Sequence, residues 1–168
     1  GNKANSDSTA IGYCEIHDAR PVLTDLVNEK LSPGDTIREA IKLGLIHNCR
    51  LIAIESVAYQ ATLKYWFDFV CNQQGIVGFE VVEVYPGGWS KNSRILSMLK
   101  SYAAGELFID PACRPIAHLQ ITQFNPLKTD NTDDVLDLLA YMNKVIEQYG
   151  AFIMTASIIQ MQEIMSIP

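Results

Sequence analysis

The chain has 168 residues, of which 48% are hydrophobic and 19% charged, and this composition excludes a disordered protein and suits one globular domain with its own core. A net charge of −6 argues against a protein that holds nucleic acid by bulk electrostatics, although acidic residues of a nuclease site would add to that total. No apolar run approaches the ~20 residues of a membrane span. The polar residues 1–9 do not resemble a signal peptide, so a cytoplasmic location is expected.

The first third of the chain predicts a hairpin and a helix. Residues 9–16 and 20–29 favour two antiparallel strands joined by a turn at residues 17–19. A Ser-Pro-Gly-Asp loop then caps a helix expected at residues 36–47, because apolar residues recur there at helical spacing.

The middle of the chain alternates between strands and helices. The expected order is strand 51–55, helix 59–74, strand 79–85, helix 91–104 and a short extended piece at 106–109. The strand at 51–55 is wholly apolar until its last residue, as a buried parallel strand would be. The pattern therefore predicts an α/β fold in which parallel strands follow the antiparallel pair.

The last third predicts a strand at residues 116–124, where apolar residues alternate, and a helix at 132–149. Residues 151–168 are apolar and rich in methionine, which fits either a strand that leads into a helix or an interaction segment. Such a surface is unusual in a monomer, so a homo-oligomer is one expectation. We treat residues 1–168 as a single domain with a core of residues 1–149 and an apolar C-terminal segment of residues 150–168.

The four cysteines lack the spacing of a metal or redox motif, and no pair forms a Cys-x-x-Cys sequence. Each lies in or next to an apolar segment. They are interpreted as small hydrophobic residues in a reducing compartment.

The acidic residues give the strongest chemical signal. Asp133 and Asp134 are adjacent at the start of the helix expected at 132–149, and Asp137 follows one turn later. One aspartate is enough to cap a helix, and several like charges together favour a cation between them. Glu55 ends a buried strand, and the carboxyl ends of parallel strands are where α/β proteins gather ligands. A solvated helix start and a solvated strand end are the plainer interpretations.

Three further residues are weaker candidates. Lys91 and Arg94 open a helix, where the dipole disfavours cations, so they could instead contact phosphates. A solvated helix face explains them about as well. Asp7 precedes the first strand and is explained equally well as a turn or cap residue.

Four stretches, in this order, resemble a known family. Asn-Ser-Asp-Ser-Thr-Ala-Ile at residues 5–11 resembles an Asp-x-Thr-Ala segment, and Ile-Ala-Ile-Glu-Ser at 52–56 resembles a strand that ends in a catalytic glutamate. Lys-Asn-Ser-Arg-Ile at 91–95 resembles a Lys-x-x-Arg-Ile helix start, and Thr-Asp-Asp-Val-Leu-Asp at 132–137 resembles an Asp-Asp-x-x-Asp helix. The family is the C-terminal nuclease domain of the large subunit of phage terminases, and the resemblance extends to about residue 149.

The resemblance implies a ribonuclease-H-like mixed sheet flanked by helices, and a Mg²⁺- or Mn²⁺-dependent DNA endonuclease that uses two metal ions during genome packaging. It implies that Glu55 and Asp134, or Asp133 beside it, are catalytic metal ligands. Asp7 and Asp137 would be accessory acids, and Lys91 and Arg94 would contact DNA. Double-stranded DNA would be the substrate, a small terminase subunit and a portal possible partners, and a phage or prophage in a bacterial host the origin.

The sequence departs from the family at its start. In the family a central strand carries the first catalytic aspartate before the segment that Asp7 matches, and here that strand is expected to be missing, as is the ATPase domain. The metal site is therefore expected to be incomplete, with two unpaired strand edges that the C-terminal segment or a second copy of the chain could cover. Two alternatives remain: another ribonuclease-H-like nuclease such as a junction resolvase or transposase core, and a non-catalytic remnant or interaction module.

Overall fold

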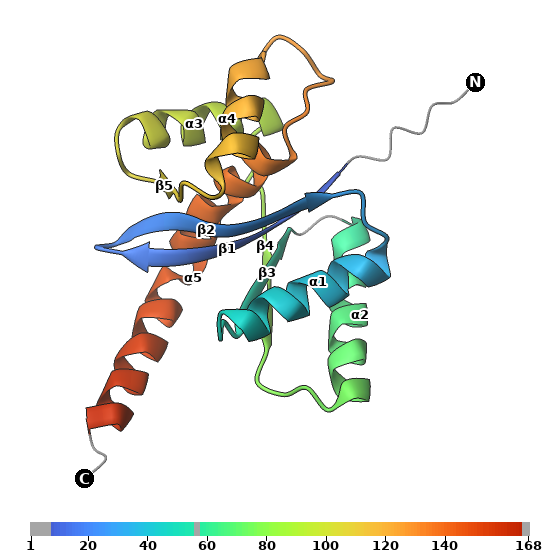
Figure 1. Ribbon diagram of the computed structural model, residues 1–168, viewed down its shortest axis with the longest axis vertical. Helices are drawn as coiled ribbons and strands as arrows, with labels where there is room; N and C mark the ends of the chain where they lie inside the picture. The colour runs from blue at the N-terminus through green and yellow to red at the C-terminus, as the bar shows by residue number, and fades with distance from the viewer. Residues whose placement is uncertain (1–7, 56–57, 166–168) are drawn as a thin grey trace.

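A computed structural model describes residues 8–55 and 58–165 as an α/β fold, in which helices cover the faces of two small sheets (Figure 1). The predicted α/β class is therefore confirmed.

The first sheet is built on the predicted antiparallel hairpin. Strands β1 (Thr9–His17) and β2 (Arg20–Glu29) pair along their whole length and are joined by Asp18 and Ala19. Both turn residues have positive φ, at 51° and 61°, as a two-residue type I′ turn requires. The short strand β5 (Phe108–Ile109) adds to β2 in parallel, so the order is β1-β2-β5.

The second sheet has two parallel strands, β3 (Leu51–Glu55) and β4 (Glu80–Val84). Among the described residues, no strand pairs with both sheets. One edge of each of β1, β5, β3 and β4 therefore remains without a strand neighbour in this part of the chain.

Two helices pack on one face of the β3-β4 sheet. Helix α1 (Pro33–Ile46) begins at Ser32, whose hydroxyl accepts a hydrogen bond from Asp35 N at 3.1 Å, and α2 is Ala58–Gln74. They share a core with the sheet that consists of Ile37, Ile41, Ile54, Phe67, Cys71 and Val81.

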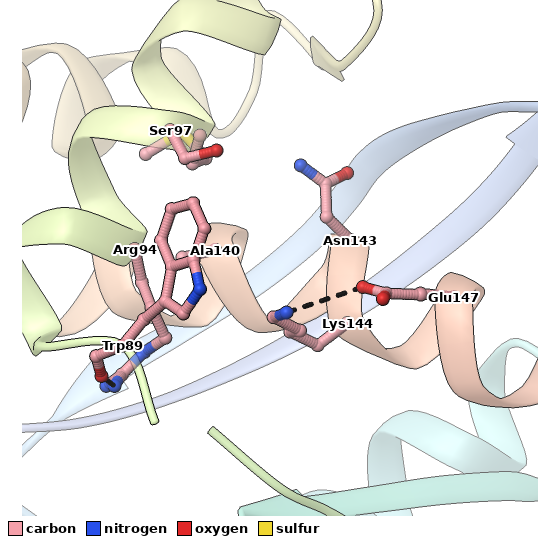
Figure 2. Close-up of a pocket in the computed structure, with 8 residues that line it drawn as sticks. Trp89, Arg94, Ser97, Ala140, Asn143, Lys144 and Glu147 are labelled. Carbon is pink, nitrogen blue, oxygen red and sulfur yellow. Dashed lines mark hydrogen bonds and ion pairs between the residues drawn. The ribbon is translucent and has the colours of Figure 1, made fainter. Parts of the chain in front are cut away.

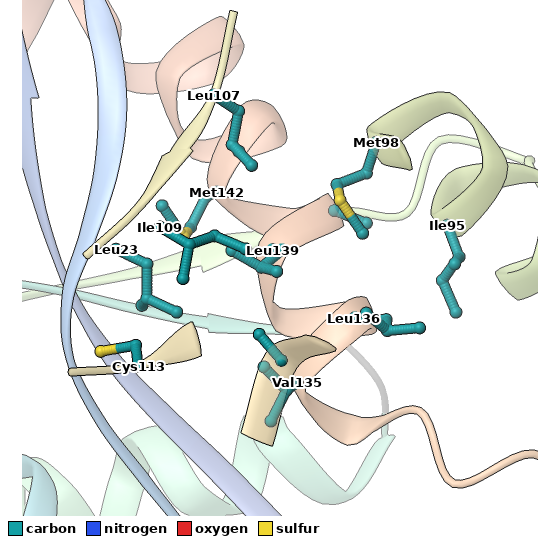
Figure 3. Packing of buried hydrophobic residues seen from close by; sticks show 12 residues of the cluster. Leu23, Ile95, Met98, Leu107, Ile109, Cys113, Val135, Leu136, Leu139 and Met142 are labelled. Carbon is teal, nitrogen blue, oxygen red and sulfur yellow. The ribbon is translucent and has the colours of Figure 1, made fainter. Parts of the chain in front are cut away.

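Helix α5 (Asp134–Met165) packs on one face of the β1-β2-β5 sheet. Helices α3 (Lys91–Ala103) and α4 (Arg114–Gln123) pack against α5. Their apolar side chains converge with those of the sheet in the larger core, as Figure 3 shows for Leu23, Ile109 and Leu139. Gly12 on β1 lets α5 approach closely, since a Cβ there would lie 2.7 Å from the Leu138 side chain.

Helices α1 and α5 hold the two sheets together from opposite faces. On β1, Gly12 faces α5, whereas Tyr13 stacks on His47 at the end of α1 with ring centroids 4.0 Å apart. On the second sheet, Ile54 faces α1 and α2, while the α5 residue Tyr149 donates a hydrogen bond to the carbonyl oxygen of Glu83 at 2.7 Å. Both sheets thus lie in one middle layer between α1 and α5.

Two predictions about the last third of the chain need correction. The strand predicted at residues 116–124 is wrong, because this segment lies in α4. Its inward side is formed by Ala117, Gln120, Ile121 and Phe124, which follow helical spacing. The helix predicted at 132–149 does not end there, since α5 continues to Met165 through most of the supposed C-terminal segment.

No helix in the described part of the chain combines the length and apolar character needed to cross a membrane. The four cysteines are free thiols, and Cys71 and Cys113 are buried, as expected for small core residues.

Candidate functional site

The candidate site lies where the end of β3 meets the first turns of α5. Glu55 is the last residue of β3, and its side chain lies on the opposite face from Ile54, which packs against α1 and α2. The Tyr141 hydroxyl of α5 donates a hydrogen bond to Glu55 Oε1 at 2.6 Å. This contact joins two segments that are 86 residues apart in the sequence.

The acidic run opens α5 as the sequence predicts. The carbonyl oxygen of Asp133 accepts the first helical hydrogen bond, from Asp137 N at 2.8 Å. The buried Gln120 side chain of α4 accepts a second hydrogen bond from Val135 N at 2.9 Å. One of the free backbone N–H groups in the first turn of α5 therefore finds its acceptor on the neighbouring helix α4.

Helix α3 supplies cations to these acids. Lys91 Nζ lies 2.6 Å from Asp133 Oδ1, and Asp133 is 6% exposed. The guanidinium of Arg94 lies 3.2 Å from Asp137 Oδ1 and donates a second hydrogen bond to the carbonyl oxygen of Trp89 at 3.0 Å. It also lies over the ring of Tyr141, 4.9 Å from its centroid. The cation that the clustered carboxylates require is therefore present as two side chains.

The charges of this site influence one another. Burial raises the pKa of Asp137, and the negative charge of Glu55 raises it further, while Arg94 and Lys91 oppose the rise. Burial and the hydrogen bond to Glu55 also raise the pKa of Tyr141. Glu55 and Asp137 are linked through two side chains, because Tyr141 donates a hydrogen bond to Glu55 and Arg94 contacts both the Tyr141 ring and Asp137.

The pKa of Lys91 is influenced by the acids at the start of α5. Burial alone would lower the pKa of its ammonium group, but the ion pair with Asp133 and the charges of Asp137 and Asp134 raise it. Asp134, Asp137 and Tyr141 are three and four residues apart on α5, so they lie on the same side of the helix. Asp134 therefore lies about one turn before Asp137 and about 10 Å along the helix axis from Tyr141, the residue that contacts Glu55.

The structure thus links Glu55, Tyr141, Arg94 and Asp137 by successive side-chain contacts, and it pairs Asp133 with Lys91 at the start of α5. Asp134 opens the helix one turn before Asp137. Lys91 and Arg94, predicted to contact DNA, have acidic partners here. Asp7 lies outside the described residues.

Sequence reasoning missed Tyr141 and Gln120. Tyr141 could have been found because it lies seven residues after Asp134, on the same side of the helix. No signal marks Gln120, whose role depends on how α4 packs against α5.

A divalent metal fits this donor set only in part. Carboxylate oxygens are the ligands that Mg²⁺ and Mn²⁺ prefer. The described residues contain no group of three or more His, Cys, Asp or Glu side chains able to hold a metal ion. A metal here would therefore be held by one or two carboxylates and complete its coordination with water and substrate phosphate, as Mg²⁺ often does.

Comparison of the chain with protein-family models, curated proteins and solved structures gave no match.

Proposed function

We propose that the chain is a ribonuclease-H-like nuclease domain of the phage terminase type, which hydrolyses phosphodiester bonds of double-stranded DNA with Mg²⁺ or Mn²⁺. One observation carries the proposal: Glu55, at the carboxyl end of a parallel strand, contacts the helix that begins with the acidic run. This is the pairing of strand end and helix start that the family resemblance requires.

The divided middle layer also supports the proposal. The family's sheet has a central strand that carries its first catalytic aspartate. In the described residues, β1 and β3 each have an unpaired edge, and both sheets lie between α1 and α5. A strand that paired with both edges would join the two sheets into one mixed sheet.

In this proposal Glu55 and Asp134 would hold the metal, with Asp133 as the neighbouring ligand. A bound metal would supply Lewis-acid activation of water and stabilisation of the leaving oxygen. Arg94 orients Asp137 and Tyr141, and Tyr141 in turn fixes the position of Glu55. Action in the cytoplasm of a bacterial host, and contact with a small terminase subunit and a portal, belong to the same proposal.

Nicking of supercoiled plasmid in Mn²⁺ tests this function. Two proteins are compared: the chain itself, and a version with an Asp-bearing strand joined upstream of Gly1. Cleavage by the second protein that is lost in Glu55→Gln and in Asp134→Asn, but kept in the exposed control Asp68→Asn, supports the proposal. Cleavage that persists in Glu55→Gln contradicts it, and preference for branched DNA would favour a junction resolvase.

A non-catalytic module with the same fold is the second candidate. It is favoured by the ion pairs, because Lys91 and Arg94 already neutralise Asp133 and Asp137. Under this candidate neither protein cleaves DNA, and Glu55→Gln changes only stability. The plasmid assay therefore separates the two candidates.

A further inference from the structure

The most exposed large apolar side chain in the described part of the chain is Leu127, at 92%. It lies in the connection between α4 and α5, which Figure 1 shows in orange at the far end of the molecule from α1 and α2. Singly exposed apolar residues are common on protein surfaces, but this one stands on a loop whose backbone is fixed by hydrogen bonds.

Asparagine side chains hold the backbone on both sides of Leu127. The Asn131 side chain accepts a hydrogen bond from Asn125 N at 2.9 Å and donates to the carbonyl oxygens of Asn125 and Lys128 at 2.8 and 3.1 Å. Asn92 of α3 also donates to the carbonyl oxygen of Lys128, at 3.2 Å. Leu127 N itself donates to Asn125 Oδ1 at 2.9 Å. The loop therefore presents its leucine in a fixed position, which reduces the entropy lost when that side chain is bound.

An apolar hollow of about 250 Å³ lies between the start of α1 and the middle of α2. We call it the α1–α2 hollow, and its lining residues are Pro33, Gly34, Ile37, Trp66 and Val70. Ile37 is buried in the smaller core, whereas Trp66 is 47% exposed, so the hollow leads from solvent to that core. Its volume is large enough for a leucine side chain.

A cavity of about 110 Å³ between α3 and α5 is less suited to a partner (Figure 2). Lys144 Nζ lies 5.9 Å from the centroid of the Trp89 ring and 3.4 Å from Glu147 Oε2. Arg94, which also lines this cavity, is paired with Asp137. The aromatic face and the charges of this cavity therefore already have partners within the chain.

The charged side chains beside the exposed leucine and beside the α1–α2 hollow are complementary. Lys128 and Asp130 follow the leucine, both are exposed, and neither forms an ion pair with another described side chain. At the hollow, the guanidinium of Arg38 lies 3.6 Å from the position that a Cβ on Gly34 would take, and it pairs with Asp35. Each feature thus presents one cation and one anion at the surface, and each charge has an opposite charge to meet.

We propose that Leu127 of one copy of this chain enters the α1–α2 hollow of a second copy. The two features lie at opposite ends of the molecule, so one copy cannot fill its own hollow (Figure 1). The contact is head-to-tail, and it leaves a free leucine on one copy and a free hollow on the other, which allows further copies to add. Its area is small, so the association is weak and depends on concentration. The proposal does not depend on the nuclease function.

Sedimentation velocity of the full chain, from about 10 µM to about 1 mM, tests the contact. The mean sedimentation coefficient should rise with concentration, and Leu127→Asp should weaken this self-association about tenfold or more. Gly34→Met should weaken it similarly by filling the hollow, and its Cβ would meet only the Arg38 side chain, at ordinary contact distances. The control Val77→Asp, at a residue that is 82% exposed and outside the hollow, should associate as the natural chain does.

Mixing the two variants tests the head-to-tail geometry. Leu127→Asp keeps an open hollow and Gly34→Met keeps the leucine, so the mixture should form a complex of two chains and no larger species. A mixture that stays monomeric, or a natural chain whose sedimentation does not change with concentration, would overturn the proposal. Association that persists in Leu127→Asp would also overturn it, because the contact would then lie elsewhere, for example on residues 150–165 of α5.

Discussion

The two packing units of this molecule differ in how completely their core side chains are buried. Among the side chains that the structure describes, the unit of β1, β2, β5 and α3–α5 has a core cluster of twelve residues, several of which are completely buried. On the same basis, the unit of β3, β4, α1 and α2 has a cluster of six, of which the least exposed, Phe67, is 2% exposed. The larger unit carries the acidic run and its cations, and the smaller unit carries Glu55.

The difference shows that the site depends on the junction between the units. Glu55 lies on a sheet of only two strands, and its side chain is held by Tyr141 of the larger unit. The larger unit therefore provides the rigid support, and the Tyr141–Glu55 hydrogen bond fixes the end of β3 to it. The predictions below test this relation, from the largest expected effect to the smallest.

Core truncation should cost more in the larger unit. Leu139 is 0% exposed, so Leu139→Ala should lower the free energy of unfolding by about 4 kcal/mol. Ile41→Ala in the smaller core, where the residue is 6% exposed, should cost about 2–3 kcal/mol. Urea denaturation followed by circular dichroism measures both values, and an equal or reversed order would contradict the comparison.

The two cations of the junction should differ in their effect on stability. Arg94→Met should cost about 3 kcal/mol, because the Asp137 side chain, 16% exposed, would lose its partner in a buried setting. Lys91→Met should cost about 2 kcal/mol, because Asp133, 7% exposed, would also lose its partner, although the replaced Lys91 side chain is 47% exposed and water can take part of its place.

A double variant provides the control for this pair. Adding Asp137→Leu to Arg94→Met should recover part of the lost stability, because the unpaired carboxylate is removed. If the double variant is less stable than Arg94→Met by the full cost of a separate mutation, the two side chains do not act as a pair.

Tyr141→Phe should lower stability by about 1.5 kcal/mol at neutral pH, through loss of the hydrogen bond to Glu55. The natural chain should also lose stability as pH rises above the ordinary phenol pKa of 10.0. There the folded state, with its raised pKa, binds more protons than the unfolded state.

Urea unfolding at pH 8 to 11 measures this effect. The difference in stability between the natural chain and Tyr141→Phe should shrink as pH rises through that range. A difference that stays constant would show that Tyr141 has no special environment at the junction.

Much of the fold could be predicted because the first seven elements carry local signals. The hairpin, the strand that ends in Glu55 and the helix that begins at Lys91 all have clear periodicity or caps. The strand prediction for the α4 segment rests on Leu119 and Ile121, which alternate with polar neighbours, although Leu119 is exposed in the helix. Pro115, in the first turn, was the helix signal that went unused.

The candidate site was predictable in its acids but not in their partners. Clustered carboxylates and a strand-end glutamate are visible in the sequence. Which cation each acid meets depends on how α3 packs against α5, and that is a tertiary property. Lys91 and Arg94 were therefore expected to face DNA, and the structure pairs them with Asp133 and Asp137.

The most direct test of the central claim is the pKa of Asp137, measured by carboxyl-carbon NMR titration in the natural chain and in Glu55→Gln. If Glu55 and the acids of α5 share one electrostatic site, the pKa of Asp137 lies above its ordinary value of 3.8 in the natural chain and falls when the Glu55 charge is removed. An unchanged pKa in Glu55→Gln would contradict the account, because the strand-end glutamate and the helix-start acids would then act independently.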